Sequence, residues 1–97
     1  METKQLAGIL GSLGQETRLE ILKLLSPLSR NALATGMAAG KIVEILGVRS
    51  PTLSFHLKDM TLRHILVQKR IGREVHYLVN HDLLAQALEG LVVQLEK

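Results

Sequence analysis

The sequence predicts a mostly α-helical fold with one small β-hairpin, a winged helix-turn-helix in the order α-α-α-α-β-β-α. Three observations predict it. Two stretches with apolar residues at helical spacing flank Gly47 near the middle of the chain. Two β-rich stretches then flank Gly72, as in a hairpin. Further apolar helices stand at both ends, and the 97 residues predict a single domain, residues 1–97.

Two helices are predicted before the central glycine. Residues 2–13 carry apolar side chains at helical spacing, and residues 17–25 carry a second such set. The second helix ends at Ser26, because a residue before proline is pushed out of the α-helical region. Residues 28–37 show no clear pattern and predict either a short helical turn or a loop.

The helix-turn-helix is predicted at about residues 38–63. Gly47 supplies the sharp turn, since glycine adopts a positive φ without strain. Ser50 is predicted to cap the second helix and Pro51 to take its first position, where a missing N–H costs nothing. The small core that the two helices share is predicted to contain Ile42, Leu46, Val48 and Leu53.

The wing is predicted at about residues 65–79, and a last helix at about residues 81–96. The apolar stripe of this last helix is too wide for one small domain to cover, and the helix at residues 2–13 has a second stripe. We therefore expect a homodimer through the first and last helices; the alternative is that both stripes cap the monomer core. The predicted interface residues are Leu6, Ile9, Leu10, Leu84, Leu88, Leu91, Val92 and Leu95.

Composition excludes several classes of protein. The chain has no cysteine, which excludes disulfides, thiolate metal sites and cysteine nucleophiles. No apolar run approaches the ~20 residues that span a bilayer, and we expect a cytoplasmic protein without a membrane segment. No carboxylate pair, nucleophile–base set or phosphate-binding loop stands out, so we expect neither an enzyme nor a bound cofactor.

Positive charge is concentrated in one third of the chain. The net charge is +3, yet residues 49–76 alone hold six basic and two acidic side chains. This distribution is typical of a protein that binds a polyanion such as double-stranded DNA. The alternative is a solvated surface whose charges happen to be uneven.

The stretch "SPTLSFHLKDM", from Ser50 to Met60, predicts the surface that contacts DNA. On a helical wheel its two leucines and Met60 face the core, whereas Phe55 points outward. Phe55 either packs under the preceding helix, is exposed without a role, or meets thymine methyl groups in a major groove, and we favour the last. The predicted contacts of this helix are Arg49, Ser50, Pro51, Thr52, Ser54, Phe55, His56 and Lys58.

Two details of this surface leave alternatives open. Ser54 and His56 lie on opposite borders of the helix, which excludes a nucleophile–base pair. His56 either orients a neighbouring group inside the protein or contacts a phosphate. The wing either lies along the DNA backbone or is a solvated, charged hairpin. Its predicted DNA-binding residues are Lys69, Arg70, Gly72 and Arg73.

Three stretches together resemble the ArsR family, the arsenic-repressor-type winged-helix regulators. "SLGQETRLEILKLL" resembles the family's second-helix block, "AAGKIVEILGVRSPTLSFHLKDM" its helix-turn-helix with a Ser-x-His-Leu signature, and "ILVQKRIGREVHYLV" its wing. The resemblance covers roughly residues 12–79. It implies a homodimeric repressor of transcription that binds a pseudo-palindromic operator and is released by a ligand. The alternative is a winged-helix protein-interaction module without specific DNA binding.

The sequence departs from this family at the metal sites. Ala38 and Gly40 stand where metalloid-sensing members carry Cys-x-Cys. Leu84 and Leu95 stand where zinc-sensing members carry histidines. His76 and His81 could in principle bind a metal, but two loosely placed histidines are weak evidence for a site. We therefore expect no metal site, and an effector that is either recognised without thiols or absent.

Overall fold

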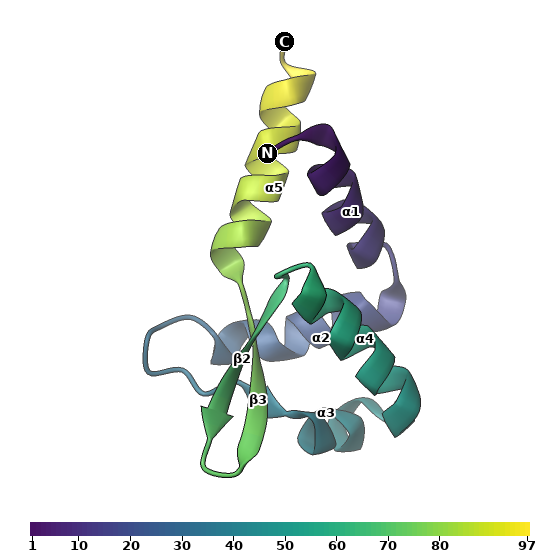
Figure 1. Ribbon diagram of the computed structural model, residues 1–97, viewed down its shortest axis with the longest axis vertical. Coiled ribbons are helices and arrows are strands. Elements are labelled where there is room, and N and C mark those ends of the chain that lie inside the picture. Colours follow the sequence, from purple (N-terminus) through teal and green to yellow (C-terminus); the bar gives the residue numbers. More distant parts are fainter.

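The computed structural model describes residues 1–97 and confirms a winged helix-turn-helix (Figure 1). Helices α1 (Thr3–Leu13) and α2 (Glu16–Leu25) are followed by a single 3-10 turn, η1 (Ser26–Leu28). The helix-turn-helix consists of α3 (Ala39–Leu46) and α4 (Ser50–Leu62). Strands β2 (Leu66–Ile71) and β3 (Glu74–Val79) form the wing, and α5 (His81–Leu95) is the last helix.

The molecule is elongated, with extents of 47 × 29 × 19 Å. Helices α1 and α5 pack together and extend away from the body, so both chain termini lie at one end (Figure 1). The beginning of α4 and the tip of the wing lie toward the opposite end. None of the helices combines the length and the apolar character that crossing a membrane requires.

A short third strand, β1 (Met37–Ala38), is missing from the predicted order of elements. It pairs antiparallel with β3, with Met37 opposite Tyr77, so the sheet order is β1-β3-β2. In the wing, the register runs from Leu66 opposite Val79 at one end to the turn at Gly72 at the other. Two residues are too few to show a period, so this strand is defined only by its pairing with β3.

The ends of the helices follow local chemistry. Gly47, with φ of +68°, ends α3 in the left-handed conformation that was predicted for it. The predicted cap of α4 is wrong by one residue: Arg49 occupies the N-cap position, Ser50 is already helical, and no side chain caps this helix. At α5, the side chain of Asn80 accepts a hydrogen bond of 3.2 Å from the N–H of Leu83.

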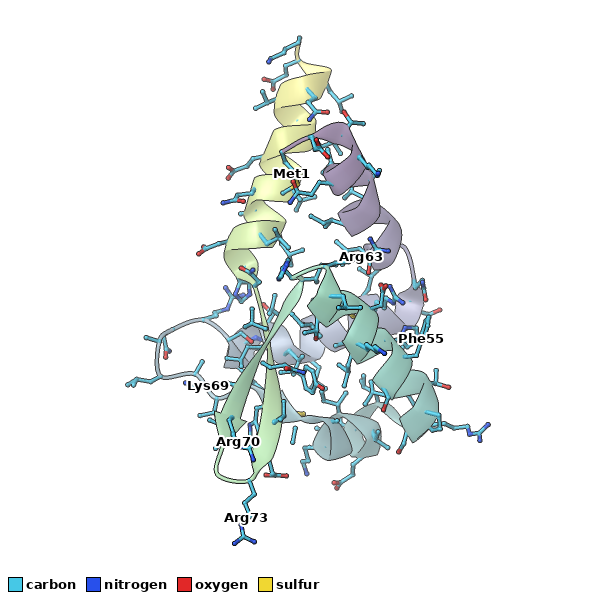
Figure 2. The ribbon with its side chains drawn as sticks, viewed as in Figure 1. Met1, Phe55, Arg63, Lys69, Arg70 and Arg73 are labelled. Atoms are coloured by element: carbon cyan, nitrogen blue, oxygen red, sulfur yellow. The ribbon has the colours of Figure 1, made fainter.

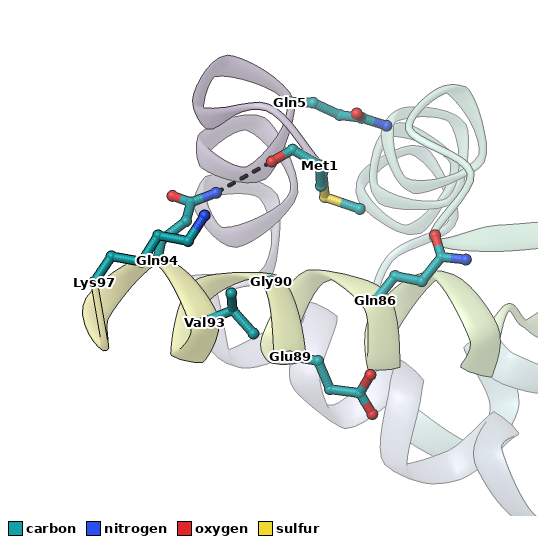
Figure 3. Close-up of a pocket in the computed structure, with 8 residues that line it drawn as sticks. All are labelled: Met1, Gln5, Gln86, Glu89, Gly90, Val93, Gln94 and Lys97. Atoms are coloured by element: carbon teal, nitrogen blue, oxygen red, sulfur yellow. Dashed lines mark hydrogen bonds between the residues drawn. The ribbon is translucent and has the colours of Figure 1, made fainter.

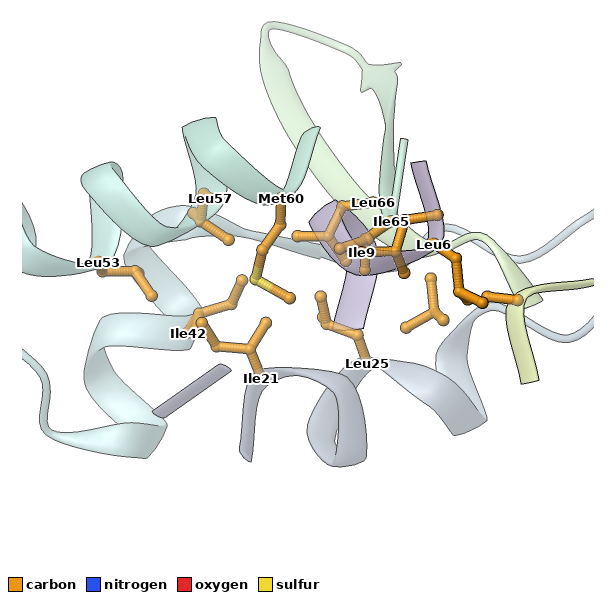
Figure 4. Close-up of a cluster of buried hydrophobic side chains, with 12 residues drawn as sticks. Leu6, Ile9, Ile21, Leu25, Ile42, Leu53, Leu57, Met60, Ile65 and Leu66 are labelled. Atoms are coloured by element: carbon orange, nitrogen blue, oxygen red, sulfur yellow. The ribbon is translucent and has the colours of Figure 1, made fainter. Parts of the chain in front are cut away.

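The core is an aliphatic cluster of 12 buried residues in which α4 lies over α2, with α3 and the start of the wing at its sides (Figure 4). Ile21, Ile42 and Met60 are among its fully buried members. Leu6 and Ile9 also belong to it, so their predicted place at a dimer interface is wrong. Helix α1 turns these two side chains toward α2 and α5 of the same chain, which removes them from the surface.

Candidate nucleic-acid interface

The residues that α4 buries show which side of the helix faces the core. Leu53, Leu57 and Met60 face the core, and the opposite side of the helix is therefore exposed. Phe55 has 65% of its surface exposed, which is unusual for a phenylalanine and excludes packing under α3. The predicted contacts that the structure exposes are Arg49, Ser50, Pro51, Thr52, Ser54, Phe55 and Lys58.

His56 is the exception among the predicted contacts. Only 7% of it is exposed, and its Nδ1 accepts a hydrogen bond of 2.9 Å from Nε of Arg18. Of the two roles that the sequence left open, the structure supports the orienting one. The interpretation of His56 as a phosphate contact is wrong for this conformation, because the ring is used inside the protein.

Beneath the exposed face of α4 lies a polar cluster that joins three helices. Arg18 of α2 donates to His56, to the carboxylate of Asp59 and to Ser12 of α1, whose hydroxyl accepts at 2.7 Å. The carboxylate of Asp59 also accepts from the hydroxyl of Ser12 at 3.0 Å and from Nε of Arg63 at 3.3 Å. The cluster therefore attaches α4 to both α1 and α2.

Sequence reasoning missed this cluster, although a signal for it was present. Arg18, Ile21 and Leu25 are the buried residues of α2, at helical spacing i, i+3 and i+7. An arginine therefore stands at a core position of an apolar stripe. Charged residues are almost never fully buried without a partner, so such an arginine predicts a buried acceptor elsewhere in the chain.

The cluster shifts the pKa values of two of its members. Burial lowers the pKa of His56, the charge of Arg18 lowers it further, and the charge of Asp59 opposes both. Burial raises the pKa of Asp59, but hydrogen bonds from Ser12 and Arg18, the charge of Arg18 and a hydrogen bond from Arg63 outweigh it and lower the value. Asp59 is therefore a carboxylate near neutral pH and His56 is a neutral acceptor.

Mild acid is expected to destabilise the fold through His56. The unfolded chain has the ordinary pKa near 6.5 and the folded chain a lower one, so the unfolded state binds more protons between these values. The contribution of His56 to the free energy of unfolding is therefore complete above about pH 6.5. It decreases as the pH falls toward the pKa of His56 in the folded protein. Thermal unfolding as a function of pH measures this.

His56→Asn is the matched control for this prediction. The asparagine oxygen lies near the position of Nδ1 and accepts from Arg18, but it does not titrate in this range. The variant is expected to lose the part of the acid sensitivity that appears below about pH 6.5. An identical pH dependence in both proteins would contradict the assignment to His56.

The basic side chains of the wing differ in exposure. Arg70 and Arg73 are exposed, and Arg73 extends from the tip of the hairpin away from the body (Figure 2). Gly72 forms the turn with φ of +61°. Lys69, by contrast, is half-buried and donates at 2.9 Å to the carbonyl of Ala34, so its ammonium is partly used within the chain.

A hollow lies at the other end of the molecule, between the start of α1 and the end of α5 (Figure 3). Gln94 crosses from α5 to α1, where its Nε2 donates to the backbone oxygen of Met1 at 3.1 Å. The remaining lining is mostly amide and methylene groups, with one carboxylate, Glu89, and one amine, Lys97. This hollow holds no pair of groups that suits acid–base chemistry.

Next to this hollow, α5 exposes an apolar face with nothing over it. Only Ala87 of the helix is buried, whereas Leu88 is 56% and Leu95 75% exposed. Leu84 and Leu91 are half-buried at its border, and so is Leu10 on α1. A monomeric domain rarely leaves a face of this kind uncovered, so it marks a surface for a partner.

Comparison with known proteins agrees with a helix-turn-helix fold. A family model described as a helix-turn-helix domain matches residues 13–66. The arsenical resistance operon repressor of Staphylococcus aureus is 31% identical over 91 residues, which cover 94% of this chain and 81% of that protein.

Solved structures show the same fold. An ArsR-like transcriptional regulator from Rhodococcus sp. RHA1 superposes with a TM-score of 0.78 at 24% identity, over 91% of this chain and 76% of that one. The homodimeric winged helix-turn-helix DNA-binding domain of a Mycobacterium bovis protein superposes with a TM-score of 0.70 at 24% identity, over 96% and 81% of the two chains.

Proposed function

This chain belongs to the ArsR family of winged helix-turn-helix regulators and is a DNA-binding repressor of transcription; we propose that it acts as a homodimer on a pseudo-palindromic operator. In this proposal α4 enters the major groove of each half-site, and the wing lies along the adjacent backbone. A repressor acts where its operator lies, so we place it with the DNA in the cytoplasm.

One observation carries the assignment of α4. The exposed residues among positions 49–58 are cations, hydroxyls, a proline and one phenylalanine, and this stretch contains no carboxylate. The nearest acid, Asp59, is already held by Arg18. A helix face with this composition suits a DNA groove, where a carboxylate would be repelled by phosphates.

Roles for the individual side chains follow from their chemistry. Phe55 is proposed to pack against thymine methyl groups, and Thr52 and Ser54 to contact base edges or phosphates. Arg49 and Lys58 are proposed to bind phosphates on either side of the helix. In the wing, Arg70 and Arg73 are the proposed backbone contacts, and Gly72 allows the turn between the strands.

The dimer is proposed to form through the exposed face of α5 with support from α1. After Leu6 and Ile9 are assigned to the monomer core, the proposed interface residues are Leu10, Leu84, Leu88, Leu91, Val92 and Leu95. Two-fold symmetry would place the two α4 helices about one turn of DNA apart, roughly 34–36 Å between half-site centres. With no cysteine in the chain, we propose that any effector is bound without thiolates.

The proposal is tested by titrating the dimer with DNA from the promoter region of its own gene and with a scrambled duplex, at two salt concentrations. We expect the promoter duplex to bind at least about 1,000-fold more tightly, and both affinities to fall as salt rises. Equal affinity for both duplexes would overturn specific DNA binding and favour a protein-interaction module.

Two single substitutions are expected to weaken binding in different ways. Phe55→Ala is expected to reduce the discrimination between promoter and scrambled DNA by about 10-fold and to leave the salt dependence unchanged. Arg73→Ala is expected to weaken binding to every sequence and to reduce the salt slope by about 2, one for each protomer of the dimer. Fluorescence anisotropy at several salt concentrations distinguishes the two, and the same response from both variants would contradict the assigned roles.

A further inference from the structure

We propose that Arg18 is a positioning residue for DNA recognition, which fixes the rotation of α4 and the orientation of Phe55 without touching DNA. The inference rests on the proposed contact between α4 and DNA. It assigns a function to a side chain of α2, outside the helix-turn-helix and the wing, that is only 3% exposed.

Arg18 contacts three residues of α4 at once. Its Nε donates to His56 at 2.9 Å, and its Nη1 donates to the carboxylate of Asp59. Its guanidinium carbon also lies 5.8 Å from the centre of the Phe55 ring, and the Phe55 and His56 rings form a T-shaped pair with a centroid distance of 5.9 Å. The exposed phenylalanine is therefore held from beneath by the arginine and its histidine partner.

These contacts are directional, whereas the apolar core is not. Leu53 and Leu57 would keep most of their burial if α4 rotated by a few degrees, because the hydrophobic effect depends on area rather than on angle. A rotated α4 would move His56 and Asp59 out of line with the planar guanidinium. The orientation of the helix is therefore expected to depend on Arg18 more than on the leucines.

The Arg18–Asp59 ion pair is expected to contribute less to the stability of the fold than to the orientation of α4. Buried ion pairs gain little net free energy, because desolvation offsets most of the attraction, and apolar replacements are often as stable. Loss of the Arg18–Asp59 pair is therefore expected to change orientation more than folding when both partners are replaced together.

The same cluster also connects α4 to the helix that flanks the proposed dimer face. Ser12, in the last turn of α1, accepts from Arg18 through its hydroxyl and through its carbonyl at 3.2 Å, and its hydroxyl donates to Asp59. A change in the rotation of α4 would therefore alter its position relative to α1 and α5, and with it the distance between the two recognition helices of a dimer.

Arg18→Lys is the first test. Lysine keeps the charge, but its single nitrogen cannot reproduce the planar fork that serves His56 and Asp59 together. We expect discrimination between promoter and scrambled duplex to fall about 10-fold, with the affinity for scrambled DNA and the salt slope unchanged. Arg30→Lys, at an exposed arginine beyond the end of α2, is the matched control and is expected to behave as the wild type.

Two results would overturn the inference. Discrimination equal to that of the wild type would show that Arg18 does not position α4. A loss of affinity for both duplexes with a salt slope smaller by about 2, one for each protomer, would show that Arg18 is a phosphate contact. Failure of the proposed function is distinguishable from both, because the wild-type protein itself would then fail to discriminate.

Two further variants keep the test decisive if Arg18→Lys does not fold. The double variant Arg18→Met, Asp59→Leu replaces the ion pair by apolar groups and is expected to fold yet to lose the same discrimination. In a Phe55→Ala background, Arg18→Lys is expected to cause a smaller loss of discrimination than in the wild type, because one part of its effect passes through that ring and the other through the rotation of α4. Normal discrimination in the apolar variant would contradict the inference, and fully additive losses would contradict the part of it that concerns the orientation of Phe55.

The pH provides a last readout, measured at temperatures where the protein remains folded so that a loss of stability does not contribute. The charged and titratable groups that face the His56 ring are Arg18 from α2 and Asp59 from α4, and α1 contributes only the hydroxyl and carbonyl of Ser12. Protonation of His56 would turn the acceptor of Arg18 into a second donor. We expect wild-type discrimination to fall as the pH decreases below the ordinary histidine pKa of about 6.5 and that of His56→Asn to remain constant. Parallel curves would oppose the inference.

Discussion

Leu88→Asp is expected to convert the dimer to monomers and to weaken operator binding by at least about 100-fold. Leu88 lies on the exposed face of α5, one helical turn from Leu84 in one direction and from Leu91 and Val92 in the other. At a two-fold interface each substitution occurs twice, so two carboxylates would face each other in an apolar contact. Such unpaired charges are expensive to bury.

The loss of DNA affinity follows from the loss of linkage between half-sites. In a dimer the second α4 binds at a high effective concentration once the first is bound, and a monomer has no such advantage. Sedimentation equilibrium measures the mass, and anisotropy measures the affinity.

Leu33→Asp is the matched control for Leu88→Asp. Leu33 is 88% exposed in the loop before β1, so the same substitution there is expected to change neither mass nor affinity. A dimeric Leu88→Asp protein, or a wild type that is monomeric at micromolar concentration, would contradict the proposed interface.

The two glycine turns could be predicted because their causes are local. Gly47 and Gly72 adopt positive φ at the turns where each was expected. Each of these signals acts within three or four residues, which a single sequence displays directly. The strand β1 could not be predicted for the opposite reason, because its two residues are ordered by β3, about 40 positions away.

The places of polar residues were less predictable than those of apolar ones. His56 lies on a border of the helical wheel, and its burial depends on Arg18, 38 residues away in the chain. A periodicity shows which face is apolar but not what covers it. Leu6 of α1 and Leu88 of α5 therefore gave the same signal, although the first lies in the monomer core and the second is exposed.

Gly36→Ala is expected to be the most destabilising single substitution considered for this chain, with a loss of more than about 3 kcal/mol of unfolding free energy. Gly36 precedes β1 and has φ of +59°. A Cβ added there would overlap the carbonyl oxygen of Tyr77 and approach Cγ of Leu78 to 2.7 Å. Because Tyr77 lies in the central strand β3, the new methyl group could be accommodated only if the loop separated from the sheet.

Gly72→Ala isolates the conformational part of this cost. Gly72 has nearly the same φ, +61°, but nothing lies within 4 Å of its added Cβ. Its alanine variant is therefore expected to lose only about 1–2 kcal/mol, the cost of a left-handed conformation. For a domain of this size each kcal/mol lowers Tm by roughly 4–8 °C, so thermal unfolding of the two variants separates steric overlap from backbone strain. Equal losses would mean that the loop before β1 moves away from Tyr77 at little cost, and that β1 contributes little to holding the wing against the body.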